Sequence, residues 1–201
     1  VNLVCDPACF ASEVYEVKRN SDSNLVGIGL IRPSIFRDYG LAISDNEIAD
    51  IYSSIINEFI AQGYTCEFFT NGDQGDISLA ELVINRHNEL TYMKDSVRIP
   101  ISARNLIETV SRYKMIFSSR MHSAITSYSL DIPCVTLCWA DKIKVFYENI
   151  GHPERCIYPK EIESSRVLDI LTQGLEEKGN DKNGFLSSYK IPINVVKQFC
   201  R

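Results

Sequence analysis

The sequence lacks a long hydrophobic segment, and its longest apolar runs are short, as in Leu25–Ile31 and Pro133–Cys138. A membrane-spanning helix needs about 20 consecutive apolar residues, so we expect no membrane span in this chain. No signal peptide is visible, but the chain opens on Val1 instead of Met, and Val1–Val4 resembles buried structure. We therefore expect the chain to continue a longer protein, and its start says little about export.

Positive charge is in short supply, because 21 lysines and arginines face 26 aspartates and glutamates, for a net charge of −5. Nucleic acids and anionic membranes are polyanions, so this balance disfavours both as general partners. A small anionic ligand would need a local cluster of basic side chains that acts against the overall field.

The seven cysteines include no C-x-x-C pair, and their number is odd. A structural zinc site favours closely paired cysteines with histidines nearby, so this spacing argues against one. Small buried thiols in a reducing compartment are the simpler interpretation, and they favour a cytoplasmic location. We expect no metal site and no cofactor.

What the sequence does contain is typical of a folded globular protein. Of its 201 residues, 45% are apolar and 23% are charged, which argues against disorder, collagen and coiled coil. The length suggests one domain, large enough to bury a core without cross-links. We place that domain at residues 1–177, followed over 178–201 by a polar linker, Lys178–Gly184, and a final helix, Phe185–Arg201.

Apolar runs that predict strands alternate with segments of helical periodicity. We expect strands at 26–31, 64–70, around 99, 114–117, 134–139 and 155–158, and helices at 48–60, 77–87, 102–112, 120–130, 142–150 and 164–175. The segment Ser44-Asp-Asn-Glu47 offers N-cap residues for the first of these helices, and Gly63 is expected to end it. This alternation predicts an α/β fold, a Rossmann-like parallel sheet with helices on both faces.

In such sheets the ligand crevice lies beyond the carboxyl ends of the strands. Basic side chains follow three of the predicted strands: Arg32, Arg120 with His122, and Lys142. Ser118 and Ser119 precede Arg120 at the start of a helix, where free N–H groups favour an anion. Arginine can grip phosphate or carboxylate with two parallel hydrogen bonds, and lysine adds a point charge. The strand ends therefore predict a compact cationic pocket for a small, multiply charged anion.

Each of these residues also has an ordinary structural interpretation. A lone arginine after a strand is usually a surface or salt-bridge residue, and a lone histidine near a helix start is usually structural. His87 and His152 are interpreted as structural. Gly27-x-Gly29 lacks the third glycine and the following helix of a dinucleotide site, so NAD binding is not expected. Trp139, the one tryptophan, suits sugar stacking and core packing about equally.

Three sequence blocks together resemble the C-terminal signature of polysaccharide pyruvyl transferases. A strand ending in Arg32 precedes them, and Asp131 stands where the family often has glycine. The blocks are Ile116-Phe-Ser-Ser-Arg-Met-His-Ser-Ala-Ile125, Asp131-Ile-Pro-Cys-Val135 and Asp141-Lys-Ile-Lys-Val-Phe146 followed by Asn149-Ile-Gly151. The resemblance covers about residues 25–152.

The resemblance implies a chain similar to the C-terminal, donor-binding half of a two-domain GT-B glycosyltransferase, preceded by an acceptor-binding domain. It implies transfer of the pyruvyl group of phosphoenolpyruvate to a saccharide as a ketal, with release of phosphate. Arg120 and His122 would be catalytic, and Arg32, Ser118, Ser119, Arg120 and Lys142 would bind substrate.

On this reading, His122 is the general acid, because histidine exchanges protons near neutral pH. A role in phosphate binding alone stays open. The acceptor would be a lipid-linked or polymeric saccharide, and apolar surface exposed by the separate half would support a homo-oligomer. Two alternatives also stay open: a nucleotide-sugar glycosyltransferase, for which Glu161 and Glu163 are candidate ribose ligands, and a non-catalytic anion-binding domain.

Overall fold

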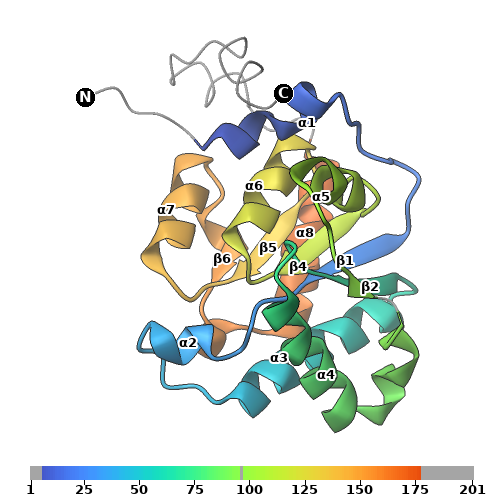
Figure 1. Ribbon diagram of the computed structural model, residues 1–201. Coiled ribbons are helices and arrows are strands. Elements are labelled where there is room, and N and C mark those ends of the chain that lie inside the picture. Colours follow the sequence, from blue (N-terminus) through green and yellow to red (C-terminus); the bar gives the residue numbers. More distant parts are fainter. Residues whose placement is uncertain (1–5, 96, 178–201) are drawn as a thin grey trace.

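A computed structural model describes residues 6–95 and 97–177 of the chain. Its described part contains one six-stranded parallel sheet with the order β3-β2-β1-β4-β5-β6 (Figure 1). The strands are β1 Leu25–Gly29, β2 Thr65–Phe69, β3 Val97–Arg98, β4 Met115–Ser118, β5 Cys134–Leu137 and β6 Cys156–Ile157. The prediction of a Rossmann-like α/β fold is confirmed.

The chain changes direction across the sheet between β1 and β4. It builds outward from β1 through β2 to β3, and then returns to lay β4 on the other side of β1. Val26 of β1 is accordingly in register with Cys66 of β2 and with Met115 of β4. The carboxyl ends of β1 and β4 are thus the switch point at which open α/β sheets bind their ligands.

Helices cover both faces of this sheet. The packing of α3 against α4 and α8 forms one layer, and α6 packs with α1 and α5 in the other (Figure 1). The helices are α1 Ala11–Tyr15, α2 Ile35–Asp38, α3 Asp45–Ala61, α4 Ile77–Arg86, α5 Ala103–Val110, α6 Met121–Ser129, α7 Asp141–Asn149 and α8 Ser164–Glu176. Short 3-10 helices, η1 to η5, span Pro7–Phe10, Gln74–Asp76, Asn88–Met93, Pro153–Arg155 and Pro159–Glu161.

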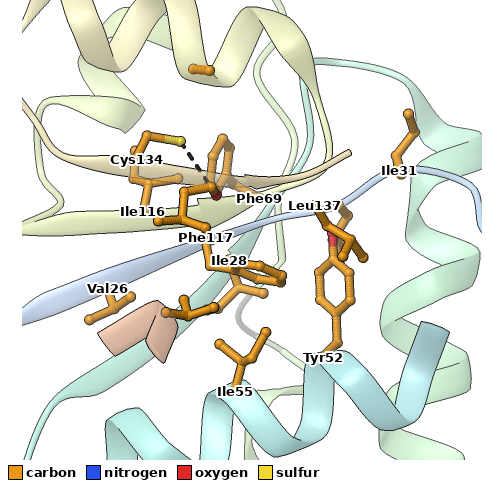
Figure 2. Packing of buried hydrophobic residues seen from close by; sticks show 14 of the residues in the cluster. Val26, Ile28, Ile31, Tyr52, Ile55, Phe69, Ile116, Phe117, Cys134 and Leu137 are labelled. Carbon is orange, nitrogen blue, oxygen red and sulfur yellow. Dashed lines mark hydrogen bonds between the residues drawn. The ribbon is translucent and has the colours of Figure 1, made fainter. Parts of the chain in front are cut away.

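The two central strands carry the core. Ile28 of β1 and Phe117 of β4 are fully buried, and the Phe117 ring meets that of Tyr52 from α3 edge-on at 5.1 Å (Figure 2). Strands covered on both faces are expected to be apolar along their length, as these are up to Ser118 at the end of β4.

The glycines of β1 make room for larger neighbours. A Cβ atom at Gly27 would collide with the ring of Tyr113, and one at Gly29 would collide with the side chain of Ser118. The Gly27-x-Gly29 pair therefore serves close packing within the sheet, in agreement with the expectation that it is no dinucleotide fingerprint.

Local sequence signals placed the long helix α3 well. Ser44 Oγ accepts from the backbone N–H of Glu47, and the Glu47 carboxylate accepts from the backbone N–H of Ser44 at 2.8 Å, which completes a capping box. Gly63, two residues after the helix, has a φ of +81°, a conformation that glycine adopts without strain. Both expectations are confirmed.

Other element boundaries differ from the predicted ones. The strand expected at 26–31 ends at Gly29, and the one expected at 134–139 ends at Leu137. The sequence did not predict α1 and α2, because helices of one turn show no hydrophobic period. Cys9, Cys66, Cys134 and Cys138 are buried, as expected for small apolar side chains. The expectations for Val1–Val4 and for residues 178–201 lie outside the described residues.

Candidate active site at the switch point

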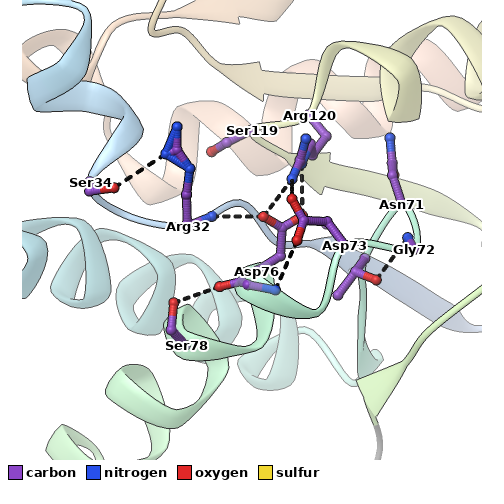
Figure 3. Close-up of polar contacts among 12 residues, drawn as sticks. Arg32, Ser34, Asn71, Gly72, Asp73, Asp76, Ser78, Ser119 and Arg120 are labelled. Atoms are coloured by element: carbon purple, nitrogen blue, oxygen red, sulfur yellow. Dashed lines mark hydrogen bonds and ion pairs between the residues drawn. The ribbon is translucent and has the colours of Figure 1, made fainter.

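Arg120 lies between β4 and α6, and both its backbone N–H and its guanidinium donate hydrogen bonds to neighbouring side chains. Its backbone N–H donates to Ser118 Oγ at 3.0 Å. Its guanidinium Nε and Nη2 donate to the two carboxylate oxygens of Asp76 at 2.7 and 2.6 Å, and Nη2 also donates to Asp73 at 2.9 Å (Figure 3). This forked, charge-assisted contact fixes both the position and the plane of the guanidinium.

Asp76 and Asp73 come from the loop that follows β2, and their surroundings differ. Asp76 is fully buried, and burial raises the pKa of its carboxyl group despite the bonds from Arg120. Asp73 is 53% exposed, and the N–H of Gly75, followed by Arg120, lowers the pKa of its carboxyl group. Both carboxylates therefore contact one arginine, but only Asp73 is open to solvent.

Arg32 follows β1 and approaches the same cluster through its backbone. Its N–H donates to Asp76 Oδ1 at 2.9 Å (Figure 3). Its guanidinium turns away from Asp76 and donates to Asp38 at 3.1 Å. Arg32 and Arg120 together contact the carboxylates of Asp38, Asp73 and Asp76, so the cluster has a formal charge of 2 − 3 = −1. The two arginines are therefore already compensated by carboxylates of the protein.

His122 lies in the first turn of α6, two residues after Arg120. Its side chain is 62% exposed, with Nε2 3.7 Å from Asp6 Oδ2. His122 and Arg120 line one cavity of about 420 Å³, whose walls include Asn71 and apolar side chains of α1 and α5. The structure brings this predicted pair together, whereas Arg32 and Lys142 do not line that cavity.

Ser118 and Ser119 are both fully buried and bonded within the protein. Ser118 Oγ accepts from the Arg120 N–H, and Ser119 Oγ shares a hydrogen bond of 2.7 Å with the hydroxyl of Tyr52. The Ser119 carbonyl also accepts from Trp139 Nε1 at 2.6 Å. Both serines support the strand end on which Arg120 stands, and their predicted contact with substrate stays a prediction.

Lys142 stands in the first turn of α7, after β5. Its side chain is exposed, and its Nζ lies 4.7 Å from the centroid of the Trp139 ring, a cation–π contact. The edge of the Tyr39 ring meets the same tryptophan at 4.7 Å. Trp139 is therefore a packed platform that connects the end of β4 to Lys142.

The sequence analysis missed Asp73, Asp76 and Asn71. They lie in a turn-rich loop directly after β2, where Asn71 accepts from Ser123 Oγ of α6 at 2.9 Å. The rule that ligand residues follow parallel strands applies to this strand as well, and it could have identified them. The prediction included only basic residues at the strand ends, and it therefore omitted the carboxylates that accept hydrogen bonds from Arg120.

A second cavity, of about 830 Å³, lies between α3 and the segment Tyr158–Ser164. Glu161 lines it, and Glu163 does not. It shares no lining residue with the cavity of Arg120 and His122. The candidate ribose ligand of the nucleotide-sugar alternative is thus separate from the arginine–histidine site.

Neither a metal site nor a membrane helix is found in the part of the chain that the structure describes. Residues 6–95 and 97–177 contain no group of three His, Cys, Asp or Glu side chains placed to hold a metal ion. Within the same ranges, no helix combines the length and the apolar character that crossing a membrane requires.

Comparisons with known proteins agree with the sequence resemblance. The family model described as polysaccharide pyruvyl transferase matches residues 1–140, which include Arg32, Arg120 and His122 and end just before Lys142. No match was found among curated proteins or among solved structures. Since the matched segment spans more than half of the sequence and contains the site at the switch point, the chain belongs to the polysaccharide pyruvyl transferase family.

Proposed function

We propose that this chain binds phosphoenolpyruvate and transfers its pyruvyl group to a saccharide as a ketal, with release of phosphate. The observation that carries the proposal is the cavity shared by Arg120 and His122 at the carboxyl end of β4. It pairs a guanidinium, which suits a carboxylate or phosphate, with an exposed imidazole that can exchange a proton. The family match supports the transferase class and a saccharide acceptor.

Arg120 is assigned to the donor through Nη1. The carboxylates of Asp76 and Asp73 use Nε and Nη2, and neither uses Nη1. We assign Arg32 and Lys142 to the same donor, because its carboxylate and phosphate carry more charge than one guanidinium can match. The guanidinium of Arg32 would exchange Asp38 for the ligand, and Lys142 would leave the Trp139 ring to reach it.

His122 is assigned as the general acid. It delivers a proton to the methylene carbon of phosphoenolpyruvate, which leaves a cationic centre at C2. A sugar hydroxyl adds to C2, the bond between C2 and the bridging oxygen breaks, and phosphate leaves with its electron pair. A second hydroxyl then adds to C2 and closes the ketal, while the two hydroxyl protons return to His122 and to phosphate or water. A positioned general acid of this kind contributes about 10²- to 10⁴-fold in rate.

The nucleotide-sugar alternative has one observation in its favour, namely that Glu161 lines the largest cavity described above. A glycosyltransferase would place the ribose against that carboxylate. The separation of this cavity from Arg120 and His122 makes it the second candidate. Cytoplasmic location and self-association stay predictions.

The experiment that tests the proposal is phosphate release from phosphoenolpyruvate that depends on an added saccharide. It uses the protein with any natural sequence that flanks this chain. We expect His122→Ala to lower the rate by about 10²- to 10⁴-fold, and Arg120→Ala to abolish saturation by phosphoenolpyruvate. Lys144→Ala, an exposed residue of α7 paired with Glu148, is the matched control and should retain the rate. Full activity in both site variants would refute the assignment.

A further inference from the structure

Asp76 is fully buried at the junction of two helices, as the last residue of the 3-10 helix η2 and the residue before α4. Its side chain accepts no hydrogen bond from the N–H groups of α4, and the cap of η2 is Asp73, which accepts from the N–H of Gly75. The carboxylate of Asp76 turns instead to the switch point, so helix stability does not explain the residue.

The Asp76 carboxylate joins the ends of three strands. It belongs to the segment after β2, it accepts from the backbone N–H of Arg32 after β1, and it accepts twice from Arg120 after β4 (Figure 3). Its Oδ1 is 2.9 Å from the Arg32 nitrogen and 2.6 Å from Arg120 Nη2, and its Oδ2 is 2.7 Å from Arg120 Nε. All three donors therefore depend on one ionised side chain.

This arrangement is costly as a means of stabilising the fold. Taking a carboxylate out of water carries a desolvation penalty that ion pairing often fails to offset. Burial raises the pKa of Asp76 even with Arg120 bound, so the charged form remains disfavoured relative to water. A buried ion pair is therefore weak evidence for a role in stability, and the geometry of this one points to a role beyond folding.

We propose that Asp76 is a positioning residue that holds the Arg120 guanidinium in the plane in which Nη1 meets the donor. This inference rests on the proposed function. Asp76 acts through Arg120 and touches no reacting atom, and the exposed Asp73 adds a second carboxylate contact to Nη2. The same carboxylate keeps the Arg32 backbone next to Arg120, so that the two cation-bearing loops stay in register.

The first test is steady-state kinetics of Asp76→Asn, which keeps the shape of the side chain but cannot accept from both Nε and Nη2. We expect the KM for phosphoenolpyruvate to rise about 10-fold or more, because a charge-assisted hydrogen bond contributes roughly 1.5–3 kcal/mol. We expect kcat to change less. A purely structural defect would lower the active fraction, and with it kcat, at an unchanged KM. Asp45→Asn, which removes the carboxylate paired with Arg37, is the matched control and should leave both constants unchanged.

The second test does not depend on turnover, and its main comparison is made within the wild-type protein. In the wild-type protein, NMR should show slow solvent exchange for the Arg120 Nε–H, compared with the exposed Arg166. Arg120→Lys assigns the signal, and Asp76→Asn should accelerate the exchange. Equal exchange at Arg120 and Arg166, or an unchanged KM in a folded Asp76→Asn variant of an active enzyme, would overturn the proposal.

The two proposals fail in different ways. If the wild type releases no phosphate in response to any saccharide, the proposed function fails, and the exchange rate still decides whether Asp76 holds Arg120. If the wild type is active and Asp76→Asn retains its KM, the proposed function stands and the positioning role is refuted.

Discussion

Two cations follow neighbouring strands at the same edge of the sheet, and the protein treats them differently. Arg120, after β4, is fixed by Asp73 and Asp76. Lys142, after β5, forms no ion pair within the described residues, and its ammonium group rests on the ring of Trp139. A planar guanidinium needs a set orientation to bind an anion in two-point fashion, whereas an ammonium group acts from any direction. The guanidinium of Arg120 is therefore oriented before any ligand binds, whereas no ion pair within the described residues orients the ammonium group of Lys142.

The largest effect on stability should come from removing the guanidinium of Arg120. Arg120→Ala leaves the carboxylate of Asp76 buried without its partner, and we expect a loss of about 3–5 kcal/mol in the free energy of unfolding. Adding Asp76→Asn should recover part of that loss, because the uncompensated charge is removed. Urea denaturation of the two single variants and the double variant measures the coupling. Additive losses would mean that the two side chains are not energetically linked.

Substitution of Lys142 should lower the activity and leave the stability of the protein nearly unchanged. Lys142→Ala removes an exposed cation–π contact worth about 0.5–1 kcal/mol, so the unfolding midpoint should move little. If the ammonium group binds the donor, kcat/KM should fall by about 10- to 100-fold, since a hydrogen bond to a charged group contributes roughly 1.5–3 kcal/mol. Lys144→Ala serves as the control from the same helix. An unchanged kcat/KM would remove Lys142 from the site.

A smaller effect is expected at Asp73, the exposed member of the pair around Arg120. Asp73→Asn removes a negative charge beside Arg120 that repels the anionic donor, and we expect the KM for phosphoenolpyruvate to fall about 2- to 5-fold, since such exposed charge pairs contribute about 0.2–1 kcal/mol. A rise in KM would show that Asp73 helps to bind the donor.

The carboxyl group of Asp73 should also make the stability of the protein depend on pH. Its pKa is lowered in the folded protein, chiefly by the Gly75 N–H and then by Arg120. The corresponding stabilisation is present above the ordinary aspartate pKa and is lost as the pH falls through the lowered value. Acid unfolding curves of the wild type should therefore fall more steeply below about pH 4 than those of Asp73→Asn. Parallel curves would contradict this.

The smallest effect should come from a residue that lies outside the cluster around Arg120, the helix cap Ser44. Ser44→Ala removes the cap of α3 and should lower the free energy of unfolding by about 1 kcal/mol, measured by urea denaturation. Activity should not change, because the cap is not part of the cluster around Arg120. A change in KM would show that the two regions are coupled.

The sequence predicted the parallel sheet, the alternation of its strands with the longer helices, and the strand ends that bear Arg32, Arg120, His122 and Lys142. Hydrophobic period and capping residues are local signals, so they were sufficient for that. The ion pairs of Arg120 were not predicted, because Asp76 is 44 residues away in the chain and the pairing depends on how β2 lies beside β1. Nor did the sequence show that Ser118 and Ser119 are fully buried.

Titration calorimetry with phosphoenolpyruvate, and with a nucleotide sugar in parallel, tests the central claim most directly. The account predicts saturable binding of phosphoenolpyruvate to the wild type, weaker binding to His122→Ala and Lys142→Ala, and no heat from the nucleotide sugar. Binding of the nucleotide sugar alone, or binding of phosphoenolpyruvate that neither substitution weakens, would contradict it.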